Sequence, residues 1–186
     1  KDMGKLGWIP SFVYIAGAAL RLARFNVNIG VVDKRFFQGL PSPAAAAVVI
    51  WAAALSAVDL RWRRLPNPLT LSGAVLITVG AAVCGRGLAA VLGAGALGGL
   101  YLAVHLADPA ALGGGDVKLA LALGALTGAF GSPVWVLAAL GAPILTAIAG
   151  MTTLVLAHGR AGGGSSVPHG PSMCVASLAA AALAVF

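Results

Sequence analysis

Residues 87–130 read GLAAVLGAGALGGLYLAVHLA-DPAALGGGD-VKLALALGALTGAF, two apolar runs joined by a short polar connection that holds Asp108 and Asp116. Further apolar runs lie at 6–23, 43–58, 69–84, 133–157 and 171–186. About 20 apolar residues span the hydrocarbon core of a bilayer as a helix, and several of these runs approach that length. The sequence therefore predicts an all-α, polytopic membrane protein, with a six-helix bundle over 43–186 and one extra N-terminal membrane helix.

Composition supports this class and excludes others. The 186 residues are 60% hydrophobic and only 9% charged, whereas a soluble domain has about 25% charged residues. The net charge of +7 does not indicate nucleic-acid binding, because most basic residues flank apolar runs, where they orient membrane helices. Cys84 and Cys174 lack a C-x-x-C partner, so no zinc module is predicted. We expect a lipid bilayer as partner and no metal or cofactor.

Small residues recur at four-residue spacing within the apolar runs. Examples are Ala120, Gly124 and Gly128 in one run, and Gly95 and Gly99 in another. In lipid, such positions let two helix backbones approach closely. The alternative is that an Ala- and Gly-rich composition produces the spacing by chance.

Three polar connections, at 59–68, 108–118 and 158–171, interrupt the second part of the chain. Together they hold five basic residues, against one in the intervening connections: Arg61, Arg63, Arg64, Lys118 and Arg160 against Arg86. Cytoplasmic loops carry the excess of Lys and Arg in membrane proteins. The three connections are therefore predicted to be cytoplasmic, with six helices crossing between 43 and 186.

This alternation brings two aspartates to one membrane face. Asp59 follows the run 43–58, and Asp116 precedes the run 117–130. Two carboxylates in a poorly solvated site do not easily both ionise, so one keeps a proton. The charged one can activate water while the protonated one polarises a peptide carbonyl. Other interpretations stay open: Asp59 pairs with Arg63 four residues on, or the glycines before Asp116 form only a flexible turn.

Residues around the aspartates suit such a site. The glycines 113–115 would let a substrate strand lie close to the backbone, and the helix start would favour the charged form of Asp116. Asn67 before Pro68 is typical of an N-cap and first helical residue.

Two of the three histidines, His105 and His169, have modest expected roles. We expect His105 to make a polar contact inside its helix. The segment Pro168-His-Gly-Pro171 is expected to form a rigid helix start, with His169 as a proton donor the less favoured alternative.

Three motifs together resemble the type IV prepilin peptidase family, membrane aspartyl proteases with a G-x-G-D motif. They are Asp59-x-Arg61-x-x-x-Leu65-Pro66-Asn67, Gly113-Gly-Gly115-Asp116-x-Lys118-Leu119 and Val167-Pro168-His-Gly170-Pro171. The resemblance covers about residues 43–186. It implies that Asp59 and Asp116 are the catalytic pair. It further implies residues that bind substrate or shape the site: Pro66, Asn67, Gly113, Gly115, Lys118, Pro168 and Gly170.

The resemblance also implies an activity and a location. The enzyme would cleave the leader peptide of type IV or Flp-type prepilins, or of pseudopilins, at the cytoplasmic face of the bacterial inner membrane. Larger family members carry an insert with paired cysteines and methylate the new N-terminus. This sequence contains no such insert, so cleavage without methylation is expected.

Residues 1–50 resemble a different family. Ala18-Ala-Leu20-Arg21-Leu-Ala-Arg24-Phe-Asn26 and Phe36-Phe37-Gln-Gly39-Leu-Pro41-Ser-Pro43 are similar to the second half of bacterial phosphatidylserine synthase. That family's D-G-x-x-A-R motif does not occur in the sequence, so no transferase activity is expected. We predict a natural or artefactual fusion, with a partial synthase-like segment at 1–42 and the peptidase domain at 43–186. The chain starts at Lys1 and stops within an apolar run, which suggests a fragment or processed form.

Two alternatives to the peptidase remain. One is an inactive or partial CDP-diacylglycerol–serine O-phosphatidyltransferase fragment. The other is a non-catalytic membrane scaffold.

Overall fold

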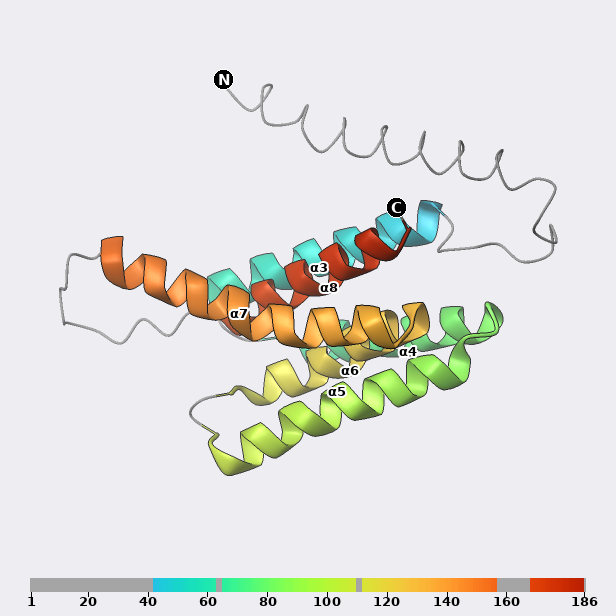
Figure 1. Ribbon diagram of the computed structural model, residues 1–186, viewed down its shortest axis with the longest axis horizontal. Coiled ribbons are helices and arrows are strands. Elements are labelled where there is room, and N and C mark those ends of the chain that lie inside the picture. The colour runs from blue at the N-terminus through green and yellow to red at the C-terminus, as the bar shows by residue number, and fades with distance from the viewer. Residues whose placement is uncertain (1–41, 63–64, 110–111, 157–167, 186) are drawn as a thin grey trace, which may run out of the picture.

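Every regular element in the described part of the chain is a helix. The computed structural model describes residues 42–62, 65–109, 112–156 and 168–185 (Figure 1). The helices are α3 (Ser42–Trp62), α4 (Asn67–Val83), α5 (Gly87–Ala107), α6 (Gly114–Phe130), α7 (Ser132–Leu156) and α8 (His169–Val185). The predicted all-α fold is confirmed. The predicted N-terminal helix and the segment 1–42, except for the start of α3, lie outside the described residues.

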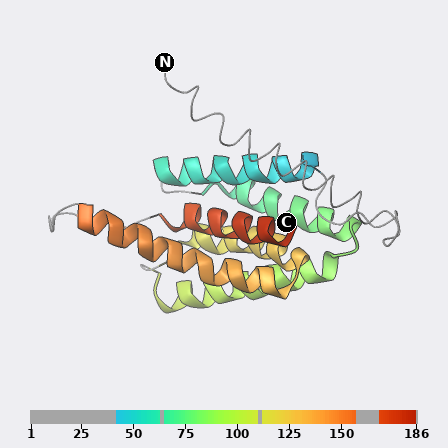
Figure 2. The same cartoon turned by 45° about the horizontal axis from the view of Figure 1, so that its top comes forward.

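Helix α6 forms the centre of the bundle. Helices α4, α5, α7 and α8 all contact it, and they lie alongside it in both orientations of the ribbon (Figures 1 and 2). Nine of its residues between Leu119 and Gly128 are buried, most of them Ala, Gly or Leu. The first turn of α6, which carries half-buried Asp116, directly precedes this buried stretch.

The outer faces of the surrounding helices are apolar. Ile50 on α3, Leu76 on α4 and Val155 on α7 are 69%, 71% and 75% exposed. Exposed apolar surface of this extent suits lipid rather than water. Three helical segments are long and apolar enough to cross a membrane, Ala45–Trp62, Gly87–Ala107 and Ser132–Thr153, and shorter apolar segments form α4 and α8. These features are those of a multi-pass membrane protein.

Glycines allow α5 and α6 to cross closely. A Cβ atom added to Gly124 would lie 2.5 Å from the carbonyl oxygen of Gly93, and one added to Gly128 would lie 2.8 Å from the Gly93 Cα. The prediction of close approach is thus confirmed for Gly124 and Gly128. It is wrong for Gly95 and Gly99, because no atom lies within 4 Å of a Cβ placed there. On α5 the contacting glycine is Gly93, which lies on another face of the helix.

The helix ends that border the three polar connections gather at one end of the bundle. The last turns of α3, α5 and α7 lie at the left in Figure 1, and the α4–α5 turn lies at the right. At that right-hand end, Arg86 Nη1 donates a hydrogen bond to the Ala129 carbonyl at 3.2 Å. The arrangement of helix ends matches the predicted alternation.

Candidate active site

Asp59 lies in the last turn of α3 and is only 7% exposed. The first turn of α8 covers it. A Cβ atom on Gly170 would lie 2.6 Å from Asp59 Oδ2 and 3.2 Å from its Cγ. This spacing leaves no room for a side chain, so a glycine at 170 is what lets α8 start against the carboxylate.

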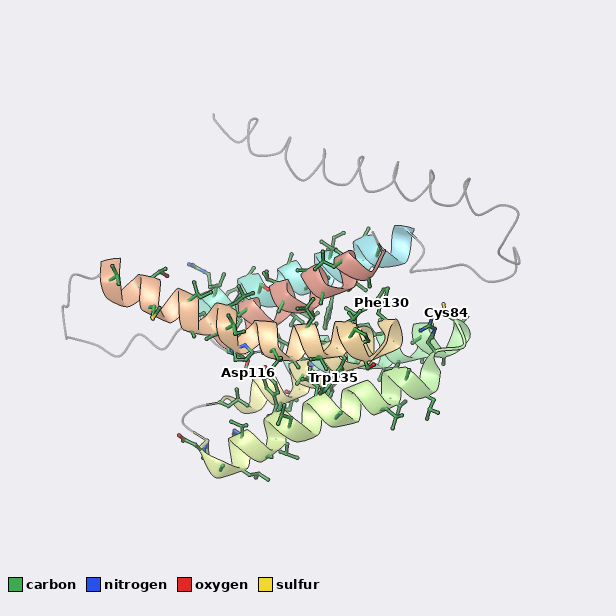
Figure 3. All side chains as sticks on the ribbon, viewed as in Figure 1. Cys84, Asp116, Phe130 and Trp135 are labelled. Atoms are coloured by element: carbon green, nitrogen blue, oxygen red, sulfur yellow. The ribbon has the colours of Figure 1, made fainter. Side chains whose placement is uncertain are left out.

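Asp116 lies in the first turn of α6, ahead of the apolar stretch 117–130 and at the opposite end of the bundle from Cys84 (Figure 3). Its pKa is raised from 3.8 to about 6, first by burial and second by the negative charge of Asp59. A hydrogen bond from the Gly113 backbone acts in the other direction. The helix start was expected to keep Asp116 charged, but burial and the second carboxylate outweigh that effect. The two aspartates are therefore close enough to interact electrostatically.

The three glycines before Asp116 have different neighbours. A Cβ on Gly113 would lie 3.3 Å from Asp116 Oδ2, and one on Gly115 would lie 3.2 Å from the Leu65 Cβ. Gly113 and Gly114 are exposed, whereas Gly115 is partly buried. The space beside Gly115 is thus filled by the chain's own Leu65, and only the backbone of 113–114 remains accessible to a substrate.

Lys118 joins the start of α4 to α6. Its Nζ donates a hydrogen bond to Asn67 Oδ1 at 2.7 Å. Asn67 was predicted to be the N-cap of α4, and this prediction is wrong. Pro66 occupies the N-cap position without a side-chain cap bond, and Asn67 is the first helical residue. The Asn67 amide oxygen accepts from the ammonium group of Lys118, while the carbonyl of exposed Pro66 accepts from the backbone of Leu69 and Thr70.

Tyr101 and Thr146, which belong to none of the sequence motifs, flank His169. The Tyr101 hydroxyl lies 2.9 Å from His169 Nε2, and Thr146 Oγ1 lies 2.6 Å from His169 Nδ1. The Tyr101 and His169 rings are stacked with centroids 5.6 Å apart. His169 follows half-buried Pro168 at the start of α8. Both missed residues are polar groups within apolar runs, which is the signal that would have identified them.

His105 holds the connection that precedes Asp116. Its Nδ1 donates a hydrogen bond to the Leu112 carbonyl at 2.7 Å. The expectation of a contact inside its own helix is wrong, because the imidazole reaches beyond the end of α5 to the buried residue before Gly113.

Other predicted features stay separate from this cluster or fall outside it. Arg63, the alternative partner of Asp59, lies outside the described residues. Asp108 is exposed at the C-terminal end of α5. Within the described ranges, no three His, Cys, Asp or Glu side chains gather as a metal ion would require.

A bundle of apolar helices with two interacting carboxyl groups at one end defines a polytopic membrane protein with a candidate acid–base site. A family model described as the type IV leader peptidase family matches residues 46–151. This match covers more than half of the chain, and the chain belongs to that family. The matched range includes Asp59, Asp116 and Lys118 and ends before α8. The protein is therefore a peptidase by family.

Two curated proteins match a shorter part of the chain. They are the CDP-diacylglycerol–serine O-phosphatidyltransferases of two strains of Helicobacter pylori, each 39% identical over 49 residues. The alignment covers 26% of this chain and 21% of each relative, so the chain spans about a fifth of the length of the curated relatives it matches. No solved structure matches the chain.

Proposed function

We propose that this protein is a membrane aspartyl endopeptidase that cleaves the leader peptide of type IV or Flp-type prepilins, or of pseudopilins. Cleavage would take place at the cytoplasmic face of the bacterial inner membrane, with Asp59 and Asp116 as the catalytic pair. Membership in the leader peptidase family supports the reaction class. The residue assignment is supported by the position of buried Asp59 in the last turn of α3 and of Asp116 in the first turn of α6, at the same end of the bundle (Figure 1). The charge of Asp59 helps to raise the pKa of Asp116.

A shared proton gives this pair both functions that peptide hydrolysis needs. The ionised carboxylate takes a proton from water, and the water oxygen bonds to the scissile carbonyl carbon. The protonated partner donates its proton to the carbonyl oxygen. As the tetrahedral intermediate collapses, the carboxyl group that took the proton from water gives it to the amide nitrogen, and the carbon–nitrogen bond breaks. One hydroxyl of the intermediate returns its proton to the other carboxylate, which restores the pair. The proton belongs to the pair, because strongly interacting groups titrate jointly.

The remaining predicted residues would position the substrate and the pair. The exposed backbone at Gly113, beside Asp116 Oδ2, is the proposed path of the substrate strand. Nearby, the Leu65 side chain packs against Gly115, and Gly170 packs against Asp59. The hydrogen bond from Lys118 to Asn67 fixes the start of α4. Pro66 and Pro168 lie next to these contacts and would limit backbone freedom at the starts of α4 and α8.

Cleavage of a prepilin leader by the purified chain in detergent or liposomes tests this function. Asp59→Asn and Asp116→Asn are each expected to lower the cleavage rate by at least about 10²-fold, because each removes one acid–base group. Asp108→Asn is the matched control, since Asp108 is an exposed aspartate on the connection that leads to Asp116. Full activity in either dyad variant would overturn the proposal.

A second proposal concerns the N-terminal segment and rests on the match to the phosphatidyltransferases. We propose that residues 1–42 are a synthase-like segment joined to a peptidase domain at 43–186. Because the sequence lacks the D-G-x-x-A-R motif, labelled serine and CDP-diacylglycerol should give no lipid-soluble product with this chain. Serine-dependent product formation would favour the transferase instead.

A further inference from the structure

A continuous series of hydrogen bonds links α5, α8 and α7, and each donor in it can be assigned. Thr146 Oγ1 lies 3.0 Å from the Ala142 carbonyl, which can only accept, so the hydroxyl hydrogen of Thr146 is committed there. Thr146 Oγ1 must then accept from His169 Nδ1, 2.6 Å away. The Nδ1–H form of a neutral imidazole has its lone pair on Nε2, which accepts from the Tyr101 hydroxyl at 2.9 Å. One arrangement of hydrogens therefore satisfies all three side chains.

Two members of this series, His169 in its middle and Tyr101 at one end, lie near the aspartates. His169 directly precedes Gly170, whose missing side chain makes room for the Asp59 carboxylate. Tyr101 is buried on α5 and interacts electrostatically with Asp116. His169 therefore joins two parts of the site. It precedes Gly170, which packs against Asp59, and it is hydrogen-bonded to Tyr101, which interacts with Asp116.

We propose that His169, as the neutral Nδ1–H tautomer, is a positioning residue of the peptidase site. It fixes the start of α8 so that Gly170 stays against Asp59, and its Nε2 orients the Tyr101 hydroxyl. It passes no proton to or from the substrate. This inference rests on the proposed function, because it assigns His169 a role through the pair Asp59 and Asp116.

Four substitutions test the assignment in the leader-cleavage assay. His169→Phe keeps an aromatic ring next to Tyr101 but removes both hydrogen bonds, and it is expected to lower kcat about tenfold with KM within about twofold. A 1 Å misplacement of reacting groups costs roughly 10²-fold, and a partial loss of alignment costs less. His169→Gln offers one donor and one acceptor without a titrating group, so it should retain kcat within about threefold.

Tyr101→Phe and Thr146→Val each remove one hydroxyl and conserve most of the volume. Each is expected to lower kcat severalfold, and Tyr101→Phe combined with His169→Phe should be no slower than His169→Phe alone. Residues in one hydrogen-bond network show this lack of additivity. Thr78→Val is the matched control, because Thr78 also donates to the carbonyl four residues earlier and is part-buried on α4.

Two results would overturn the proposal. One is unchanged kcat in His169→Phe and Tyr101→Phe. The other is an equal loss in His169→Gln and His169→Phe, which would assign His169 to proton transfer. Thermal melting of each variant in detergent separates misfolding from loss of alignment, and Thr146→Val provides the smallest structural change. Failure of the proposed function itself is distinguishable, because Asp59→Asn and Asp116→Asn would then remain active.

Discussion

Glycines lie directly against the carboxylates of Asp59 and Asp116, so that one added methyl group would contact either of them. The start of α8 packs against the Asp59 carboxylate because position 170 has no side chain, and Asp116 is half-buried in the first turn of α6. Single substitutions can therefore change the site by one methyl group, as in Gly170→Ala, or by one ionisable group, as in Asp116→Asn.

Gly170→Ala is expected to lower leader cleavage by about tenfold or more. The added methyl group would lie 2.6 Å from Asp59 Oδ2, so either the carboxylate or the start of α8 must move, and misplacement of a catalytic group slows the reaction. Gly80→Ala is the matched control, because nothing lies within 4 Å of a Cβ at that position. Equal rates in the two variants would show that the contact does not matter for catalysis.

The pH dependence of stability should reveal Asp116. Its pKa is about 6 in the folded protein against an ordinary value of 3.8, so between these pH values the folded state binds more protons than the unfolded state. The free energy of unfolding therefore falls as pH rises from about 4 to about 6. Melting in detergent at several pH values should show this decline in the parent and in Asp108→Asn, and less of it in Asp116→Asn. An identical decline in Asp116→Asn would contradict the assigned pKa.

At the scale of helices, apolar runs and basic flanks predicted most of the fold. The runs 87–107, 117–130 and 133–157 became α5, α6 and α7 within a few residues. Four-residue glycine spacing predicted the α6 face at Gly124 and Gly128 but selected the wrong face of α5. Spacing identifies a stripe of small residues, whereas only the packing of the partner helix decides which stripe is buried.

The candidate site was predictable only in part for the same reason. Asp59 and Asp116 are recognisable from their place at the ends of apolar runs. Tyr101, Thr146 and His169 come from three different helices, and their hydrogen bonds depend on how those helices rotate against each other. The role of Asn67 was mistaken because an N-cap pattern is local, while the ammonium group that binds it comes from α6.

Gly124→Ala tests the close crossing of α5 and α6. A Cβ there would lie 2.5 Å from the Gly93 carbonyl oxygen, and overpacking of this kind costs about 1–3 kcal/mol. The melting temperature in detergent should fall by several degrees. Gly99→Ala on α5 meets no atom within 4 Å and should leave the melting temperature unchanged or slightly higher, since alanine favours helix. A neutral Gly124→Ala would contradict the packing.

At the scale of the whole molecule, apolar side chains face outward around a centre rich in Ala and Gly. Lipid covers the outer faces, so close packing of small residues holds the bundle together. The polar helix ends with Asp59, Asp116 and Lys118 gather at one end, and the turn with Cys84 lies at the other. Because the connections at the end with the site carry most of the Lys and Arg residues of 43–186, we expect the site to face the cytoplasm.

Cys84 is a native reporter of this orientation. It is exposed, whereas Cys174 is buried, so a membrane-impermeant maleimide should label Cys84 from the outer side of intact spheroplasts. In a Cys84→Ser background, Asp108→Cys should be labelled only in inside-out vesicles. The reverse pattern would place the candidate site on the outer face.

The proposed function depends on Asp59 and Asp116 forming one interacting pair. The chain has five acidic side chains and no glutamate, so the infrared band of a protonated carboxyl group can be followed against little background and assigned with Asp116→Asn. The account predicts that Asp116 titrates near pH 6 in the parent. In Asp59→Asn the midpoint should shift to lower pH, while remaining above 3.8 because burial persists. A midpoint unaffected by Asp59→Asn would contradict the pair.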